Sequence, residues 1–151
     1  MSLRNVTFDE AREEMRSRAP LPEPELVPLE GLTGRRLARD VRARIDNPAF
    51  TNSAMDGFAV RAAEAISGAP LRIAGESRAG APFAGEIGPG EAIRISTGAV
   101  LPDGLDAILR KEDADDRGDA VVAAVPPAPG AFVRRRAEDS RRGDLLLPAA
   151  H

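Results

Sequence analysis

Residues 48–60 read Pro-Ala-Phe-Thr-Asn-Ser-Ala-Met-Asp-Gly-Phe-Ala-Val. Small polar residues surround one carboxylate here, Asp56, and Gly57 follows it. Because glycine adopts backbone angles closed to other residues, we expect the chain to turn sharply and to present Asp56 at the bend. A carboxylate, a hydroxyl and an amide beside a glycine suit a site for a metal ion or an oxyanion. The alternative is a loop in which Asn52, Ser53 and Asp56 bond their own backbone, which is the commoner arrangement for such residues.

Outside this segment the central part of the sequence predicts short β-strands. Val41, Ala43 and Ile45 alternate with arginines, the pattern of a half-buried strand. Turns rich in glycine and proline separate the later candidates, without helical patterns between them. This spacing favours a curled-sheet or barrel-like β lobe. The later strand candidates are 57–60, 71–74, 91–95, 107–112 and 120–125.

The two ends of the chain have a different character. Thr7-Phe8-Asp9-Glu10 has the pattern of a capping box, which predicts a helix that ends before Pro20. A weaker helix is predicted at about 29–38, and a last strand at 145–147.

We therefore predict an α+β fold that is rich in β-structure and has no Rossmann-like domain. Residues 1–45 and 131–151 would form one discontinuous lobe of helix and short strands. Residues 46–130 would form the β-rich lobe.

The composition excludes several classes of protein. The 151 residues suit one domain or two small lobes, and a net charge of −3 gives no sign of a nucleic-acid partner. The chain has no cysteine, which fits a cytoplasmic protein, and no apolar run long enough to cross a membrane. Its one histidine, His151, is the last residue, which excludes a His-based triad or a multi-His metal site within the chain.

Three further segments have residues suited to chemistry, each with an alternative. Thr97, in a loop after a strand, could bind an oxyanion, or the loop could be a simple strand-to-turn junction. Glu112 could be a second carboxylate of a site, or a solvated strand end. Between residues 134 and 142 five arginines surround two carboxylates, which suits binding of phosphates or carboxylates but also mutually paired surface charge.

Taken in order, these segments resemble one family. The run from Asn52 to Val60 resembles the signature of the MoeA and gephyrin E-domain family, the molybdopterin molybdenumtransferases. The segments 97–104, 106–112 and 134–143 resemble the blocks that follow it. Together the four blocks cover nearly the whole chain.

The sequence also departs from the family pattern. Phe58 stands where tyrosine is usual, which removes a hydroxyl. Thr51 replaces a frequent aspartate, and Ala137 a frequent glycine.

The resemblance implies insertion of molybdate into adenylylated molybdopterin, with Mg²⁺ and release of AMP. It implies a homodimer in which the active site lies between this β lobe and the α/β domain of the other subunit. By motif, Asp56 would organise molybdate or the metal, Thr97 would bond an oxyanion or orient the pterin ligand, and Asp139 would support the same cleft. These three are the catalytic candidates.

The remaining candidates have binding roles. The resemblance implies that substrate or an oxyanion is bound by Asn52, Ser53, Arg135 and Glu138. Asp56 and Glu112 are the candidate metal ligands.

Family members continue into an α/β domain that binds molybdopterin, whereas this sequence stops at residue 151. We therefore expect the isolated chain to be inactive and to need that domain in cis or in trans. The alternative is a non-catalytic dimerising scaffold or binding module that keeps the fold. The joint presence of Asp56, Thr97, Glu112 and Asp139 favours the enzyme.

Overall fold

The computed structural model describes residues 6–20 and 23–149. The chain divides into two compact units, of which Asp40–Leu147 is the larger. The described residues before Asp40 belong, with Pro148 and Ala149, to the other. The lobes predicted from the sequence have different limits and stay a prediction. Across residues 6–20 and 23–149, no helix has the length and apolar character needed to cross a membrane.

The smaller unit contains the one α-helix of the described chain, α1 (Phe8–Arg18). Its capping box is formed as predicted: the Glu10 backbone N–H donates to Thr7 Oγ1 at 3.2 Å, and the Thr7 N–H donates to Glu10 Oε2 at 2.7 Å. The helix predicted at 29–38 is wrong, because only a 3₁₀ turn, η1 (Leu29–Gly31), forms there. Gly34 has a φ of 78°, in the left-handed region, which an α-helix cannot accommodate.

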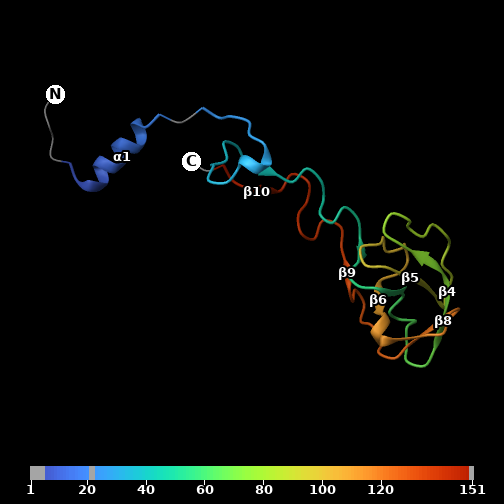
Figure 1. Cartoon of the computed structure of the whole chain (residues 1–151). Coiled ribbons are helices and arrows are strands. Elements are labelled where there is room, and N and C mark those ends of the chain that lie inside the picture. The colour runs from blue at the N-terminus through green and yellow to red at the C-terminus, as the bar shows by residue number, and fades with distance from the viewer. Residues whose placement is uncertain (1–5, 21–22, 150–151) are drawn as a thin grey trace. The chain divides into compact units, whose positions relative to one another are not determined.

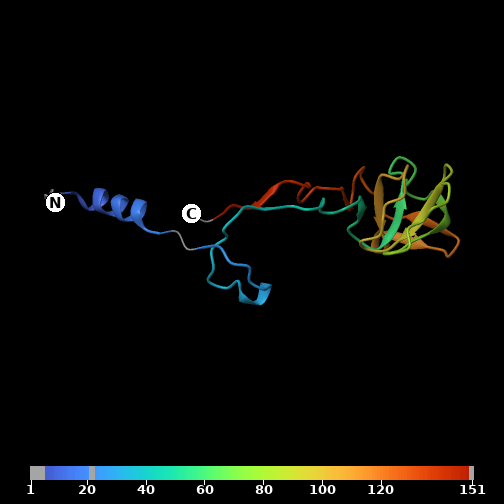
Figure 2. The same cartoon turned by 90° about the horizontal axis from the view of Figure 1, so that it is seen from above.

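The larger unit is built around a six-stranded sheet with the order β6-β3-β5-β4-β8-β7. Only the β4–β5 pair is parallel. The two edge strands, β6 and β7, are joined by a single 3₁₀ turn, η2 (Lys111–Asp113), so the sheet curls into a nearly closed barrel (Figures 1 and 2). The strands are β3 (Gly57–Val60), β4 (Pro70–Ser77), β5 (Glu91–Ile95), β6 (Ala107–Arg110), β7 (Ala114–Asp116) and β8 (Ala120–Ala123).

Both faces of this sheet are covered by apolar side chains. Alternate residues of β3 point to opposite faces, so that Phe58 and Val60 lie in one core cluster and Ala59 in another. The first cluster receives residues from all six strands, as expected for the concave inside of a barrel. The second contains Ile93 and Ile108 and is covered by loop side chains that include Phe83. The predicted curled, β-rich lobe is confirmed.

Individual strands differ from prediction at their ends. The strand predicted at 71–74 extends to Ser77, and the one predicted at 107–112 ends at Arg110, where η2 begins. The strand predicted at 120–125 ends at Ala123, before two prolines. The short strand β7 was not predicted, because two of its three residues are aspartates.

A two-stranded antiparallel ribbon leads to and from the barrel (Figures 1 and 2). Its far end pairs β1 (Val41–Arg42) with β10 (Leu145–Leu147), and its near end pairs β2 (Asn52–Ser53) with β9 (Val133–Arg134). The strand predicted from Val41 to Ile45 is therefore shorter than expected. Its alternation does not match burial, because of the three apolar positions only Ala43 is buried, whereas Val41 is 38% and Ile45 69% exposed.

Candidate functional site

Asp56 and Thr97 are joined directly, although 41 positions separate them in the sequence. The Thr97 backbone N–H and its Oγ1 hydroxyl both donate to Asp56 Oδ1, each at 2.8 Å. Within the described chain Asp56 Oδ2 accepts no hydrogen bond. The structure thus joins two of the three predicted catalytic residues.

These hydrogen bonds also set the charge of the carboxylate. The Thr97 backbone N–H, then its hydroxyl, and the nearby charge of Lys111 hold the pKa of Asp56 below its ordinary value. Asp56 is therefore an ionised acceptor near neutral pH. Its other oxygen, Oδ2, keeps its capacity to accept within the described chain.

Close contact between strands fixes the position of Asp56. Gly57, the first residue of β3, pairs with Arg110 of β6. A Cβ atom at this position would lie 2.1 Å from the Leu109 carbonyl oxygen, so only glycine fits without moving a strand. The Lys111 N–H also donates to the Asp56 carbonyl at 3.2 Å. Gly57 is therefore needed to let β3 and β6 approach closely, in addition to forming the predicted turn.

Asp56 borders a pocket of about 310 Å³. Its lining comes from β3, β4, β5, β7 and η2, so the pocket lies at one end of the barrel. The lining residues are Asp56, Gly57, Phe58, Glu76, Arg94, Ile95, Ser96, Lys111 and Asp116.

Two of the lining residues, Arg94 and Asp116, form an ion pair across the curled sheet. Arg94 of β5 and Asp116 of β7 form a two-pronged contact, with N–O distances of 2.5 and 3.1 Å, although two strands separate β5 from β7 in the sheet. The Arg94 guanidinium also lies 4.9 Å from the centre of the Phe58 ring. Arg94 is thus held by Asp116 and by the Phe58 ring. Lys111, the other cation of the pocket lining, has no ion-pair partner among the described residues.

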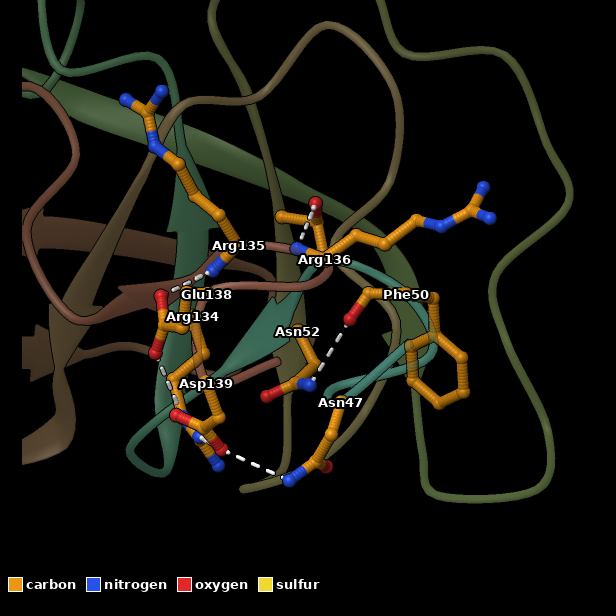
Figure 3. Close-up of polar contacts among 9 residues, drawn as sticks. Asn47, Phe50, Asn52, Arg134, Arg135, Arg136, Glu138 and Asp139 are labelled. Atoms are coloured by element: carbon orange, nitrogen blue, oxygen red, sulfur yellow. Dashed lines mark hydrogen bonds and ion pairs between the residues drawn. The ribbon is translucent and has the colours of Figure 1, made fainter. Parts of the chain in front are cut away.

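Asp139 belongs to a second polar cluster, on the ribbon (Figure 3). Its Oδ2 accepts from Asn47 Nδ2 at 3.1 Å and from an Arg134 terminal nitrogen at 2.6 Å. Glu138 accepts from Arg134 Nε at 3.0 Å and from the Arg135 backbone N–H at 2.7 Å. Among the described residues no hydrogen bond or ion pair joins this cluster to Asp56. The structure thus brings Asp139 and Glu138 together, but in a different group from Asp56 and Thr97.

The other substrate-binding candidates have structural contacts of their own. Ser53 is 1% exposed, and its hydroxyl donates to the Met55 carbonyl at 2.6 Å. Asn52 Nδ2 donates to the Phe50 carbonyl at 3.2 Å, also seen in Figure 3. These are the local backbone bonds that the sequence left as an alternative. The Arg135 side chain points away from Glu138, and its guanidinium has no partner among the described residues.

Asp56 and Glu112, the two candidate metal ligands, do not form a preformed metal site. Glu112 lies in η2 but does not line the pocket that Asp56 borders. In the part of the chain that the structure describes, no three Asp, Glu, His or Cys residues gather as metal ligands. Asp56 can still offer one oxygen, Oδ2, to a Mg²⁺ ion that takes its other ligands from water and substrate, as Mg²⁺ commonly does.

Comparison with known proteins identifies the family. Residues 6–151 match the family model described as the MoeA N-terminal region, domains I and II. The chain belongs to this family. The molybdopterin molybdenumtransferase of Haemophilus influenzae is 38% identical over 144 residues, covering 94% of this chain and 36% of that protein. The Synechococcus elongatus protein of the same name is 39% identical over 129 residues, covering 82% and 32%.

Solved structures agree with the fold. The molybdopterin biosynthesis MoeA protein from Pyrococcus horikoshii OT3 matches with a TM-score of 0.76 and 32% identity, over 83% of this chain and 34% of that one. This MoeA N-terminal region therefore spans about a third of the length of the relatives it matches.

One departure from the family pattern has a structural cost. Ala137, which the resemblance places where glycine is frequent, has a φ of 61°, in the left-handed region. That conformation disfavours a residue with a Cβ atom by about 1–2 kcal/mol. This MoeA N-terminal region therefore keeps the turn of the arginine-rich block despite the substitution.

Sequence reasoning missed the residues that shape the pocket. Arg94 and Asp116 lie 22 positions apart, and only the curl of the sheet brings them together. Lys111 is the only lysine of the chain, which is the one signal that could have drawn attention to it. In this MoeA N-terminal region the pocket depends on barrel closure more than on any local motif.

Proposed function

We propose that this chain supplies one half of the active site of a molybdopterin molybdenumtransferase, which inserts molybdate into adenylylated molybdopterin and releases AMP. The observation that carries the proposal is the Asp56–Thr97 pair, held at the rim of a pocket by two 2.8 Å hydrogen bonds. The relatives that bear this enzyme's name support it, and they are about three times as long as this chain.

In this function Asp56 acts on the ligand and Thr97 positions Asp56. The single hydroxyl proton of Thr97 is already donated to Asp56 Oδ1, so Thr97 is not free to donate to an oxyanion at the same time. Its two hydrogen bonds keep the carboxylate ionised and fixed in direction. Oδ2 is then the oxygen that would bind a metal ion or accept a hydrogen bond from the pterin ligand, and it would act on molybdate, itself an anion, through that cation.

Mg²⁺ would supply positive charge next to the phosphates and the oxyanion of the substrates. Asp56 is the residue of this chain that fits it best, whereas Glu112 lies outside the pocket lining. Lys111 contributes a second positive charge at the same rim.

The ribbon cluster has a supporting role. Asp139 accepts hydrogen bonds from Asn47 and Arg134, which lie on the two opposite chain segments of the ribbon. It would therefore stabilise the ribbon close to the barrel. Arg135, whose guanidinium is not engaged within the described chain, is the group left to meet an anion. The pterin itself requires the α/β domain, contributed in cis or by the partner subunit of a homodimer. We also place the reaction in the cytoplasm.

The test combines this chain with molybdate, Mg²⁺ and adenylylated molybdopterin, with and without a separately expressed α/β domain. AMP release and molybdenum incorporation are measured. We expect no turnover by the chain alone, turnover with the domain, and a large loss of turnover for Asp56→Asn. Asp103→Asn, on an exposed turn, is the matched control and should behave as the unmodified chain does.

Two outcomes would contradict the proposal. Turnover by the isolated chain would mean that it holds a complete site. Assembly with the α/β domain but no turnover would favour the non-catalytic scaffold.

A further inference from the structure

A second pocket, of about 230 Å³, lies on the ribbon and not at the barrel mouth. Arginines dominate its lining, with one carboxylate among them. The lining residues are Arg44, Ile45, Asp46, Ala49, Arg136 and Arg142.

The carboxylate of this pocket is already bound by its neighbours. Asp46 Oδ1 accepts from the Arg142 backbone N–H at 2.9 Å, and Oδ2 accepts from Arg136 Nε at 2.7 Å. The Arg142 N–H, followed by the Arg136 side chain, holds the pKa of Asp46 below its ordinary value. Asp46 thus remains ionised and acts as an anchor for the two arginines.

The arginines retain most of their donors. Arg136 uses only Nε on Asp46, so its two terminal nitrogens make no hydrogen bond to any described residue. The guanidinium groups of Arg44 and Arg142 likewise have no ion-pair partner in the described chain. Figure 3 shows the Arg136 side chain extending away from Asp139, so the two clusters use separate arginines.

Charge and size together indicate the ligand. Three arginines and one aspartate line the pocket, so the side chains of the lining carry a net charge of +2. A doubly charged oxyanion would neutralise this net charge, whereas a single carboxylate would neutralise only half of it. The volume is below the roughly 300 Å³ at which pockets for drug-sized ligands begin. Guanidinium groups bind phosphate oxygens in a two-pronged manner.

We propose that this ribbon pocket binds a phosphoryl dianion, either free phosphate or the terminal phosphate of a small metabolite. Arg44, Arg136 and Arg142 donate to its oxygens, and Asp46 orients Arg136. The site is separate from Asp56 and does not depend on the transferase activity.

The test is titration of the full chain with inorganic phosphate at low ionic strength, followed by NMR of the arginine Nε–H groups. We expect saturable shifts confined to the pocket arginines. An Arg44→Gln/Arg142→Gln double variant should bind about tenfold or more weakly, since each lost charged hydrogen bond weakens binding. Arg117→Gln, an exposed arginine of the barrel, is the control and should leave the affinity unchanged.

A parallel titration with adenosine 5′-monophosphate separates the two sources of the phosphoryl group. Equal affinity for both ligands supports a site for free phosphate, and tighter binding of the nucleotide supports a site for a phosphorylated metabolite. Shifts spread evenly over the surface arginines, or a double variant that binds as well as the unmodified chain, would overturn the proposal. If the NMR signals of the double variant stay as widely dispersed as those of the unmodified chain, the variant is folded, and its loss of binding is not caused by unfolding.

Discussion

Replacing Gly57 by alanine tests how closely β3 and β6 approach. The new Cβ would lie 2.1 Å from the Leu109 carbonyl oxygen and 2.9 Å from the Arg110 Cα, both of them backbone atoms. Ordinary contact begins at 3.4 Å, so the strands would have to part by the difference, roughly 1.3 Å. No side-chain rotation can relieve this contact.

The expected cost follows from two terms. Overpacking of this kind costs about 1–3 kcal/mol, and a weakened strand hydrogen bond adds about 1 kcal/mol. We therefore expect Gly57→Ala to lower the free energy of unfolding by about 3 kcal/mol. For a unit of this size that lowers the melting temperature by roughly 10–15 °C.

The assay is thermal unfolding of the full chain, followed by circular dichroism. Gly88→Ala is the matched control, because its Cβ would meet only the Glu91 side chain, at 3.5 Å and beyond, within ordinary contact. Gly75→Ala should fall between the two, since its Cβ meets the Phe83 ring, a side chain that can move. If Gly57→Ala melts at the same temperature as Gly88→Ala, the reasoning from strand contact is wrong.

Three further predictions concern charge and backbone strain. Thr97→Val removes one of the two hydrogen bonds that lower the pKa of Asp56, so NMR titration should find that pKa raised toward its ordinary value; an unchanged pKa would contradict the role of the hydroxyl. Arg94 holds the pKa of Asp116 below its ordinary value, so this pair stabilises the fold above about pH 4 and the contribution is lost as the pH falls below it. Asp116→Asn should therefore show a shallower decrease in melting temperature between about pH 5 and pH 3 than the unmodified chain; parallel curves would refute this. Ala137→Gly should raise the free energy of unfolding by about 0.5 kcal/mol, because relief of the left-handed strain exceeds the entropy cost of glycine, and a lower melting temperature would contradict that reasoning.

Strands with apolar alternation could be predicted from the sequence. β3 and β5 were predicted with their observed limits, because their buried residues form short β-branched and aromatic runs between turn signals. The weaker helix predicted at 29–38 does not form, and Gly34, one of the two glycines that interrupt the segment, adopts a left-handed φ of 78°. β7 carries acidic residues on an exposed edge and gives no apolar signal.

The site was predictable in part. Asp56 and Thr97 could be chosen because each lies in a distinctive motif, but their direct hydrogen bond could not be foreseen from residues so far apart. The bond exists because β3 and β5 are neighbours in the sheet, with Gly57 opposite Ile95. The pairing of Arg94 with Asp116 depends in the same way on sheet closure, which is a long-range property of the fold.

The pairing of β2 with β9 brings together the two points at which the chain enters and leaves the barrel. Asn52 lies opposite Arg134, so everything between them is a closed loop on a two-stranded stem. An insertion whose ends meet can be exchanged, enlarged or lost without changing the register of the stem. Asp56 and Thr97 both lie within this loop, whereas Asp139 lies on the stem. Exchange of the barrel between relatives would therefore transfer the Asp56–Thr97 pair as one inherited unit and leave the arginine-rich stem with its original protein.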